Sequence, residues 1–336
     1  MTPLYPLTFR PLVKRYLWGG RRLGTVLGKS IGEGDDYAES WEVADHGRDQ
    51  SLVANGPLAG TSLAQLVDSH GPELLGRHAP LPRFPLLLKY LDCHQNLSVQ
   101  VHPDDEAAAR LDPPDLGKTE AWLILDALPG SRVYAGLRPG VDRRSLERAV
   151  HEGRVEQCLH SFEPRVGDCI FIPAGTVHAL GAGLLIAEIQ QASDTTYRLF
   201  DWNRVGPDGQ PRQLHVEQAL AAIDYSAGPV ALQQPHSAER PFVERLVACD
   251  KFVLDRWRFE AIQPLDGDDR CHILSILAGE ALVGPANDLI GPGEPAADNV
   301  SILSLARGQT LLLPASVGDL AVRPHGACVL LDMYLP

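Results

Sequence analysis

Gly167-Asp-Cys-Ile-Phe-Ile-Pro-Ala-Gly-Thr-Val-His178 is the stretch from which the fold of this chain is most readily inferred. A turn glycine precedes a short apolar run, which predicts a β-strand. Pro173 ends that strand, because proline lacks the backbone donor that a sheet requires. Gly175 allows a tight turn, and His178 then begins a return strand. The imidazole is thereby expected to point inward.

A related stretch recurs later as Gly308-Gln-Thr-Leu-Leu-Leu-Pro-Ala-Ser-Val-Gly-Asp319. The glycine, three apolar residues and the Pro-Ala pair fall in register with the first copy, and Asp319 stands where the first copy has His178. We therefore expect two related β modules, of which the second lacks the chemistry of the first. The alternative is that Pro-Ala after a strand recurs by chance.

The rest of the chain supports a mainly β protein with a few short helices. Gly (31) and Pro (27) are frequent and separate short apolar runs, as expected for strands joined by turns. Capping residues and helical spacing of apolar residues predict three helices. The predicted strands are Leu86–Leu91, Leu97–Val101, Trp122–Leu125, Cys169–Ile172, Leu184–Ile189, His272–Leu277, Ser301–Leu305 and Ala327–Leu331, and the predicted helices are Thr61–Leu75, Asp142–Glu152 and His215–Ile223.

Composition excludes several classes of protein. Among the 336 residues, 43 acidic side chains outnumber 30 basic ones, which gives a net charge of −13 and disfavours nucleic-acid binding. No apolar run approaches the roughly 18 residues that a membrane span needs. The first residues do not have the form of a secretory signal, so we expect a cytoplasmic protein. Six scattered cysteines without a CxxC pair are then expected to be reduced thiols.

Polar residues that could carry chemistry occur on two neighbouring predicted strands. In Ser98-Val-Gln-Val-His102 polar and apolar residues alternate strictly, so Ser98, Gln100 and His102 share one face of a strand. Lys118 and Glu120 share a face in the same way. Together with His178, these residues include two imidazoles, a carboxylate and an amide oxygen.

Gln100, His102, Glu120 and His178 form a plausible ligand set for one divalent metal ion. Three or four protein ligands with a position open for water or substrate are typical of a catalytic site rather than a structural one. Imidazole and oxygen ligands suit Zn, Fe, Mn, Co or Ni. By spacing alone, a solvated sheet rimmed by polar groups explains the pattern equally well.

A further acidic residue lies within the apolar run Leu184–Ile189. Glu188 is expected to be buried, and a buried carboxylate is costly unless it has a partner or a role. Downstream, Asp194 and Arg198 would share a face if the strand continued. The structural alternative is that those two residues form an ion pair. No GxSxG, HExxH or GxGxxG motif is present in the chain.

Several segments in the same order closely resemble type I mannose-6-phosphate isomerases, most nearly the compact bacterial branch. The resemblance covers residues 1 to about 225 and is carried by Trp18-Gly-Gly, Ala38-Glu-Ser-Trp-Glu42, Phe84-Pro-Leu-Leu-Leu-Lys89, Leu97-Ser-Val-Gln-Val-His-Pro-Asp-Asp105, Gly117-Lys-Thr-Glu-Ala-Trp122, the PxGxxH turn at Pro173–His178 and Glu188-Ile-Gln-Gln-Ala-Ser-Asp-Thr-Thr-Tyr-Arg-Leu-Phe-Asp-Trp202. Leu180 departs from a position that is aromatic in some longer relatives.

The resemblance implies tandem cupin jelly rolls: a metal-binding catalytic module with helical insertions over residues 1–235, and a degenerate, metal-free module over 236–336. The Pro-, Gln- and Ala-rich segment Ser226–Arg240 is the expected linker. The implied activity is interconversion of mannose 6-phosphate and fructose 6-phosphate through a cis-enediol, with a small sugar phosphate as the only expected partner. The residues carry no signal for the oligomeric state.

The resemblance also implies roles for individual side chains. One zinc ion per chain would be held by Gln100, His102, Glu120 and His178, and Arg198 would be the catalytic arginine. Glu188 is the expected proton-transferring base, with Lys118 as the rival. The sugar-phosphate pocket would be lined by Trp18, Lys89, Ser98 and Asp194. Two alternatives remain: a cupin isomerase or epimerase of another sugar, and a non-catalytic metal-bound sensor of sugar phosphates.

Overall fold

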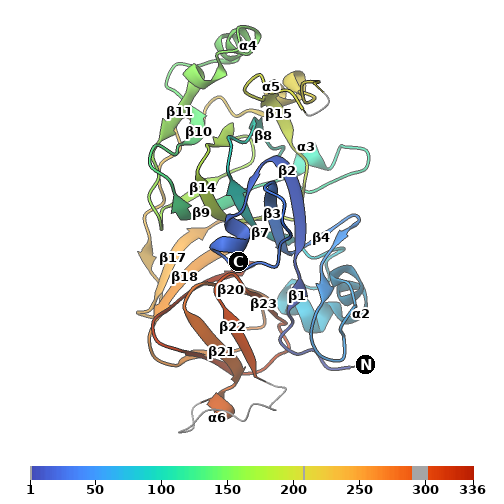
Figure 1. The fold of residues 1–336 in the computed structure, drawn as a ribbon. Helices are drawn as coiled ribbons and strands as arrows, with labels where there is room; N and C mark the ends of the chain where they lie inside the picture. Colours follow the sequence, from blue (N-terminus) through green and yellow to red (C-terminus); the bar gives the residue numbers. More distant parts are fainter. Residues whose placement is uncertain (1, 207–208, 290–301) are drawn as a thin grey trace.

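Four β-sheets are stacked in layers in the computed structural model, which describes residues 2–206, 209–289 and 302–336 (Figure 1). Each half of the chain contributes two facing sheets, as a jelly roll does. The prediction of a mainly β protein built from two β modules is confirmed. Among the described residues, none of the helices is long and apolar enough to cross a membrane.

The first half of the chain forms a six-stranded sheet in the order β12-β9-β14-β7-β3-β2 and a five-stranded sheet in the order β11-β10-β13-β8-β15. Two small two-stranded sheets, β1-β6 and β4-β5, lie beside them. The strands are β1 (Phe9–Arg10), β2 (Leu12–Gly20), β3 (Tyr37–Val43), β4 (Asp45–His46), β5 (Asp49–Gln50), β6 (Leu52–Val53), β7 (Leu86–Cys93), β8 (Val99–Val101), β9 (Glu120–Ala127), β10 (Val133–Leu137), β11 (Leu159–Phe162), β12 (Cys169–Ile172), β13 (His178–Leu180), β14 (Leu184–Gln191) and β15 (Tyr197–Phe200).

Short helices join these strands, and capping residues determine where they begin. Ser62 forms a capping box with Gln65 at the start of one helix, and Asp142 forms another with Ser145. Figure 1 shows α4 and α5 at the end of the molecule remote from the second half. The helices are α1 (Arg22–Thr25), α2 (Leu63–Leu75), η1 (Gly76–His78), α3 (Asp105–Ala108), α4 (Arg143–His151), η2 (Val155–Cys158), α5 (Val216–Ala222) and α6 (Ala286–Leu289).

The second half repeats the strand order of the first. Its six-stranded sheet is β16-β17-β18-β25-β20-β23, and its four-stranded sheet is β19-β24-β21-β22. Each of these strands therefore has a counterpart at the same place in the first half, with β12 matching β23, β9 matching β20 and β14 matching β25. The strands are β16 (His236–Ser237), β17 (Val243–Ala248), β18 (Val253–Phe259), β19 (Gln263–Leu265), β20 (His272–Ala278), β21 (Glu280–Pro285), β22 (Leu303–Ala306), β23 (Thr310–Leu313), β24 (Leu320–Pro324) and β25 (Cys328–Tyr334).

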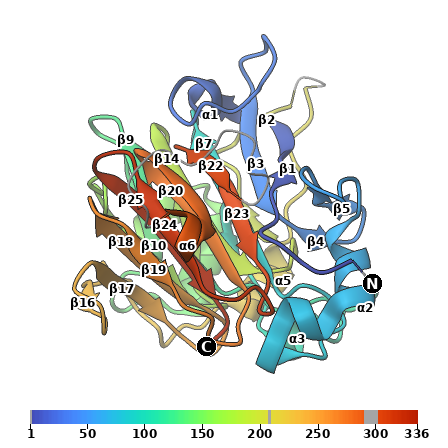
Figure 2. The ribbon, with the colours of Figure 1, turned by 90° about the horizontal axis from the view of Figure 1, so that it is seen from below.

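The two six-stranded sheets pack against each other, which makes one continuous core across both halves of the chain. Leu88 and Ala187 of the first half share a buried cluster with Ile273 and Met333 of the second. Figure 2 views the stacked sheets along the molecule. At the same boundary, a Cβ on Gly308 would lie 2.3 Å from the carbonyl oxygen of Leu27, so the backbones are in close contact there.

Alternation along the strands decides which side chains face which layer. In β14, Leu185, Ala187 and Ile189 face the second half, whereas Leu184 and Ile186 pack between the two sheets of the first half. Glu188 follows in the same alternation and therefore points between the two sheets of its own module. Strands covered on both faces read as continuous apolar runs, which is why β7 and β14 were readily predicted.

The expected linker Ser226–Arg240 contacts both modules: Val230 and Gln233 donate their backbone N–H groups to Ala135 and Cys169 of the first module, and His236–Ser237 forms β16 of the second. One expectation needs correction. A strand was predicted at Ser301–Leu305, but in the structure it begins at Leu303. Ser301, the first residue of the prediction, lies outside the described residues. The N-terminal strands β2 and β3 were not predicted, because their sequences mix charged, aromatic and small residues.

Candidate metal centre and pocket

The predicted site residues meet where strand ends of the first module come together. His178 is the first residue of β13 and pairs directly with Gln100 of β8. Glu120 begins β9, the neighbour of β12. Gly175 takes a positive φ of 84° in the turn before His178, a conformation that favours glycine. The strand and turn predicted from the sequence therefore deliver this imidazole to the interior.

Both histidines are oriented by main-chain carbonyl groups. Nδ1 of His102 lies 2.9 Å from the oxygen of Thr195, and Nδ1 of His178 lies 2.9 Å from that of Thr176. Because a carbonyl oxygen only accepts, each Nδ1 must carry the proton, and each Nε2 is left with a free lone pair. Such an outer hydrogen bond is the usual support of a metal-binding imidazole.

Burial keeps these imidazoles neutral. It lowers the pKa of His178 to about 4, and burial together with nearby Lys118 lowers the pKa of His102 well below its ordinary value. Both side chains are almost fully inaccessible to solvent. Neutral imidazole is the form that binds a metal ion.

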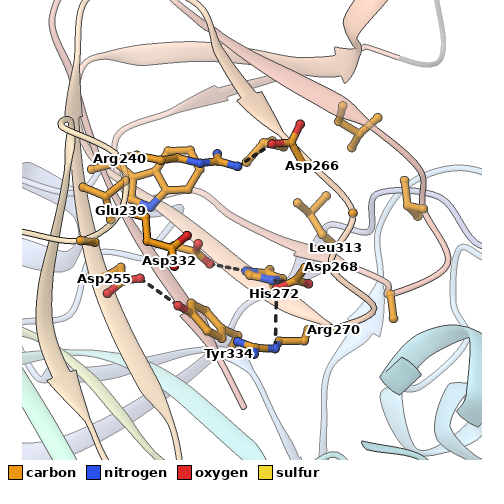
Figure 3. A pocket seen from close by; sticks show the side chains of 18 of the residues that line it. Glu239, Arg240, Asp255, Asp266, Asp268, Arg270, His272, Leu313, Asp332 and Tyr334 are labelled. Atoms are coloured by element: carbon orange, nitrogen blue, oxygen red, sulfur yellow. Dashed lines mark hydrogen bonds and ion pairs between the residues drawn. The ribbon is translucent and has the colours of Figure 1, made fainter. Parts of the chain in front are cut away.

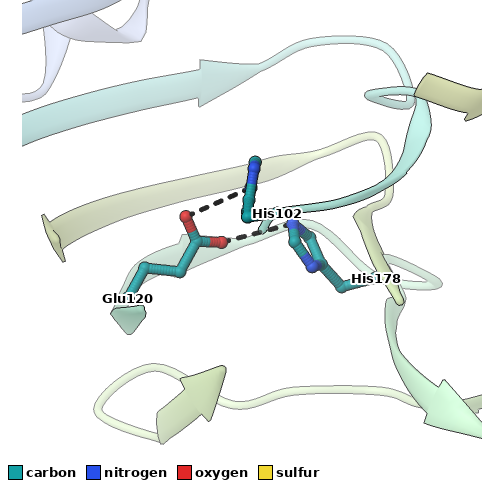
Figure 4. A group of neighbouring side chains, drawn as sticks. All are labelled: His102, Glu120 and His178. Atoms are coloured by element: carbon teal, nitrogen blue, oxygen red, sulfur yellow. Dashed lines mark ion pairs between the residues drawn. The ribbon is translucent and has the colours of Figure 1, made fainter. Parts of the chain in front are cut away.

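The carboxylate of Glu120 faces both imidazoles, with one oxygen toward each (Figure 4). Oε1 is 3.3 Å from Nε2 of His178, and Oε2 is 3.6 Å from Nε2 of His102. One ligand atom from each of the three residues fits within a spread of 4.8 Å. Oε1 of Glu120 is buried and accepts no hydrogen bond in the described structure.

The distances are of the size that a metal site requires. A zinc ion with ligand bonds of about 2.0–2.1 Å separates its ligand atoms by roughly 3.3–3.4 Å, close to the 3.3 Å between Oε1 of Glu120 and Nε2 of His178. An unpaired buried carboxylate oxygen is costly, and a bound cation would remove that cost. The residues present therefore fit a divalent metal ion.

Two neighbouring side chains complete the surroundings of this centre. Nε2 of Gln100 lies 3.3 Å from Nε2 of His178, while its amide oxygen accepts from Ser98 at 3.2 Å. The ammonium group of Lys118 contacts Oε2 of Glu120 and lies 3.1 Å from Nε2 of His102. The positive charge of Lys118 thus lies next to Oε2 of Glu120 and Nε2 of His102, two of the atoms that could bind a metal ion.

A cavity of about 320 Å³ opens beside the centre. Its volume lies within the range of about 300–1,000 Å³ that is usual for small-molecule sites. The wall combines aromatic, acidic and basic side chains, and its residues come from eight strands and the loops between them. It includes all of the residues predicted to bind or convert the substrate: Trp18, Lys89, Ser98, Lys118, Glu188, Asp194 and Arg198.

Glu188 is buried among basic groups. Its Oε1 lies 3.6 Å from Nζ of Lys89 and 3.8 Å from Nζ of Lys118, while Trp122 donates to Oε2 at 3.0 Å. Burial alone would raise the pKa of Glu188, but the two ammonium groups outweigh it and lower the pKa. The carboxylate is therefore ionised and can accept a proton.

Arg198 lies at the opposite wall and is half-buried. Its Nε donates to Ser98 Oγ at 3.3 Å, and one terminal nitrogen donates to the carbonyl oxygen of Gln213 at 2.7 Å. Within the described part of the chain Asp194 forms no ion pair with Arg198, so the structural alternative for that pair is not supported. Asp194 is exposed and lines the cavity.

The structure adds residues that the sequence did not indicate. Tyr16, Glu39 and Arg212 also line the cavity. Asp115 accepts from Ser193 and Thr195 at 2.8 Å each, and so fixes the loop whose carbonyl orients His102. Asp115 is far from these partners in the chain and sits in a Pro-rich loop, so no spacing pattern pointed to it.

Comparison with known proteins identifies similar chains. The family model "Phosphomannose isomerase type I, catalytic domain" matches residues 7–118. The chain is 32% identical to the mannose-6-phosphate isomerase ManA of Bacillus subtilis over 325 residues, covering 96% of this chain and 98% of that one. It is also 32% identical to the mannose-6-phosphate isomerase of Streptococcus mutans over 278 residues, covering 83% and 86% of the two chains.

Solved structures agree with these sequence matches. The crystal structure of the Bacillus subtilis mannose 6-phosphate isomerase superposes with a TM-score of 0.87 at 29% identity, over 99% of this chain and 100% of that one. A structure described as a mannosephosphate isomerase homologue from Archaeoglobus fulgidus gives a TM-score of 0.75 at 23% identity, which is a likeness of fold. The expected tandem cupin architecture is thereby confirmed.

Proposed function

Because the chain belongs to the type I phosphomannose isomerase family, we propose that it interconverts mannose 6-phosphate and fructose 6-phosphate with the help of one zinc ion. The observation that carries the proposal is a set of converging metal ligands beside a cavity lined by Lys89, Lys118 and Arg198. Local positive charge is what a dianionic sugar phosphate requires in a protein whose net charge is −13.

We propose His102, His178, Glu120 and Gln100 as the zinc ligands. The first two present unprotonated Nε2 atoms, of which that of His102 lies 3.1 Å from Nζ of Lys118, and Glu120 presents an oxygen that accepts no hydrogen bond in the described structure. Gln100 would contribute its amide oxygen, which requires the oxygen and nitrogen of its amide group to exchange places by a 180° rotation. When bound, zinc supplies Lewis-acid stabilisation of charge that develops on the sugar oxygens.

The proposed reaction moves a proton between C2 and C1 of the open-chain sugar through a cis-enediol. Glu188 would take the proton from one carbon and return it to the other, as an ionised and buried carboxylate can. Lys118 is the rival for this role, because it lies 3.8 Å from Glu188 and also contacts Glu120. Arg198, as a forked and permanently charged donor, would stabilise the enediolate oxygen or hold the phosphate group.

The remaining assignments concern binding and organisation. Trp18, Lys89, Ser98 and Asp194 would contact the sugar phosphate, since all four line the cavity. We propose that residues 1–235 form the catalytic module and residues 236–336 a second module without a metal ion. The strand order repeated in the two halves supports this division.

The proposal is tested by assaying isomerisation of mannose 6-phosphate before and after chelation. We expect a strong chelator to abolish turnover, and added zinc to restore it, because the charge on the sugar oxygens then regains its counter-ion. A fully active chelated protein would disprove the metal's role. Binding of zinc and sugar phosphate without any product would instead indicate a sensor, and turnover of a different sugar would indicate a related isomerase.

A further inference from the structure

The second module contains a cavity of its own, which lies between its two sheets and has a volume of about 510 Å³ (Figure 3). All of its lining residues lie between Ser237 and Tyr334, so the cavity is separate from the metal centre. The volume is within the usual range for small-molecule sites, about 300–1,000 Å³. A module that served only as a structural support would be expected to fill this space with apolar side chains.

The cavity occupies the place that corresponds to the catalytic site of the first module. Glu120 begins β9 and pairs with Ile172, the residue before Pro173. His272 begins β20 and pairs with Leu313, the residue before the corresponding proline. His272 is therefore the structural counterpart of Glu120.

Two further charged positions correspond in the same way. Glu188 of β14 is paired with Lys89 of β7, and Asp332 of β25 is paired with Asp255 of β18. Strand order and register make Asp332 the counterpart of Glu188 and Asp255 the counterpart of Lys89. The second module thus keeps buried charged side chains at the positions that form the site of the first, although their identities have changed.

The described residues of this second cavity include no group that meets the geometry of a metal site. Asp319 stands where the first module has the metal-ligand candidate His178. Within the part of the chain that the structure describes, the only cluster of His, Cys, Asp and Glu side chains close enough to share an ion is His102, Glu120 and His178.

Five carboxylates, including Glu239 and Asp332, face three arginines and His272 on the cavity wall, so this wall has no excess of basic side chains, unlike that of the catalytic cavity. Each arginine of the wall faces a carboxylate: Arg245 makes a two-pronged contact with Asp255 at 2.7 and 3.0 Å, Arg240 contacts Asp266 at 2.6 Å, and Arg270 faces Asp268 at 3.6 Å. An anionic ligand would have to compete with these carboxylates. A neutral ligand with many hydroxyl groups can donate to the acids and accept from the guanidinium groups at once.

Two side chains in the wall of the second cavity, Trp257 and Asp255, have hydrogen-bonding capacity that the described structure does not use. Trp257 lines the cavity, is 5% exposed, and its indole N–H is buried without a hydrogen-bond partner. Asp255 accepts from Arg245 and from Tyr334 at 2.9 Å, which leaves a carboxylate lone pair available. Aromatic rings beside such paired polar groups suit the alternating apolar and hydroxyl-bearing faces of a sugar.

The rim of the cavity is held in place by the first module. The backbone N–H of Arg77 donates to the carbonyl of Asp269, and Ala315 and Ser316 donate to carbonyls at the end of α2. These loops border the opening, so the cavity is preformed.

From this counterpart position, the arginines that are each paired with a carboxylate and the unpartnered indole, we propose that the second module is a metal-independent binding site for a neutral, hydroxyl-rich ligand of monosaccharide size. Its key contacts are Asp255, Trp257, His272 and Asp332. The proposal does not depend on the isomerase reaction, which concerns the other cavity.

The test uses the full-length protein labelled with 5-fluorotryptophan and followed by fluorine NMR. The chain has 5 tryptophans, and the resonance lost in Trp257→Phe reports on the second cavity alone. We expect titration with D-mannose and with D-glucose to shift that resonance saturably, in chelated as well as in zinc-loaded protein. Asp255→Asn should weaken this binding by about tenfold, because a hydrogen bond to a charged group contributes about that factor.

Glu244→Gln provides a matched control. Glu244 precedes Arg245 on β17 and faces the opposite side, where it pairs with Arg256 at 2.7 Å. We expect this variant to bind the sugars as the unmodified chain does. Tyr334→Phe, which removes one donor to Asp255 but keeps the ring, should weaken binding and serves as a second variant if Asp255→Asn fails to fold.

Three results would overturn the proposal. The Trp257 resonance could stay unchanged with both sugars up to their solubility limits. It could respond only to inorganic phosphate or mannose 6-phosphate, which would make the cavity an anion site. Its response to the neutral sugars could also disappear in Arg198→Ala, which would show that the shift is transmitted from the catalytic cavity.

Discussion

At the scale of single residues, two main-chain carbonyl groups orient the histidines of the candidate metal centre. Thr195 and Thr176 fix the Nδ1 protons of His102 and His178, so both Nε2 lone pairs point toward Glu120. In the pocket, the ammonium groups of Lys89 and Lys118 outweigh the effect of burial and lower the pKa of Glu188, so its carboxylate is ionised. The proposed roles in metal binding and proton transfer therefore belong to two different carboxylates, Glu120 and Glu188.

Arg198→Ala tests the arginine. We expect kcat to fall by roughly a hundredfold or more, the usual scale for the loss of an electrostatic stabiliser of the transition state. Steady-state kinetics with mannose 6-phosphate and elemental analysis of the purified variant provide the measurement. Because the side chain contacts Ser98 and Gln213 rather than a metal-ligand candidate, zinc content should be unchanged. A variant that loses its metal would make Arg198 a structural residue.

Glu188→Gln tests the base. A glutamine keeps the size of the side chain and the contact with Trp122, but it cannot take up a proton. We expect exchange of the substrate's carbon-bound proton with solvent deuterium, followed by NMR, to be suppressed together with turnover. Lys118→Met is the comparison that distinguishes the rival. If exchange proceeds normally in Glu188→Gln and stops in Lys118→Met, Lys118 is the base.

At the scale of elements, the site depends on a contact between two loops that flank the strands. The loop before β9 carries Asp115, and the loop after β14 carries Ser193 and Thr195, which donate to it. Arg83 pairs with the same carboxylate at 2.9 Å from the segment before β7. One side chain thus joins three connecting segments around His102, a proposed metal ligand.

Asp115→Asn should loosen this junction. An amide lacks the charge and one of the acceptor oxygens that Asp115 offers, so the Thr195 carbonyl becomes less well placed for His102. We expect zinc affinity to fall by about tenfold, at the lower end of the range for outer-shell changes at metal sites. Competition with a chromophoric chelator measures it.

Asp112→Asn serves as the control, because Asp112 is exposed in the same loop and should leave zinc affinity unchanged. Equal zinc affinity in the two variants would contradict a role for Asp115 in positioning His102.

Elements with strong local signals could be predicted, whereas contacts between distant loops could not. The strand around Gln100 follows from strict alternation, and α4 follows from Asp142 as its cap. The strands β2 and β3 were missed because their pairing in the sheet, and not their own composition, determines their structure. Asp115 was missed because its partners are 78 and 80 residues away in the chain.

At the scale of the whole molecule, the four layers explain why the second module is present in full although it lacks the ligand set. The inner sheets cover each other, so Leu88 and Ala187 are buried in the same cluster as Ile273 and Met333. The side-chain hydroxyls of Tyr90 and Ser275 are hydrogen-bonded across the same boundary. The sequence repeat predicted two modules, but it carried no information on how they pack, since that depends on the outer faces of both sheets.

The candidate site could be assembled from the sequence because its members begin or end strands that a common fold brings together. His178, Gln100 and Glu120 were predicted to meet, and they lie within a few ångströms of one another. The second cavity could not be predicted, because its charged residues come from several segments that are far apart in the chain. Only the register of β18, β20 and β25 reveals that they share one space.

The most direct test of the account is to locate the metal ion by anomalous X-ray scattering at the zinc edge, in crystals of active full-length protein. We predict a single strong peak per chain, at about 2.0–2.1 Å from Nε2 of His102, Nε2 of His178 and a carboxylate oxygen of Glu120. An active crystal with no anomalous peak between these three side chains would contradict it.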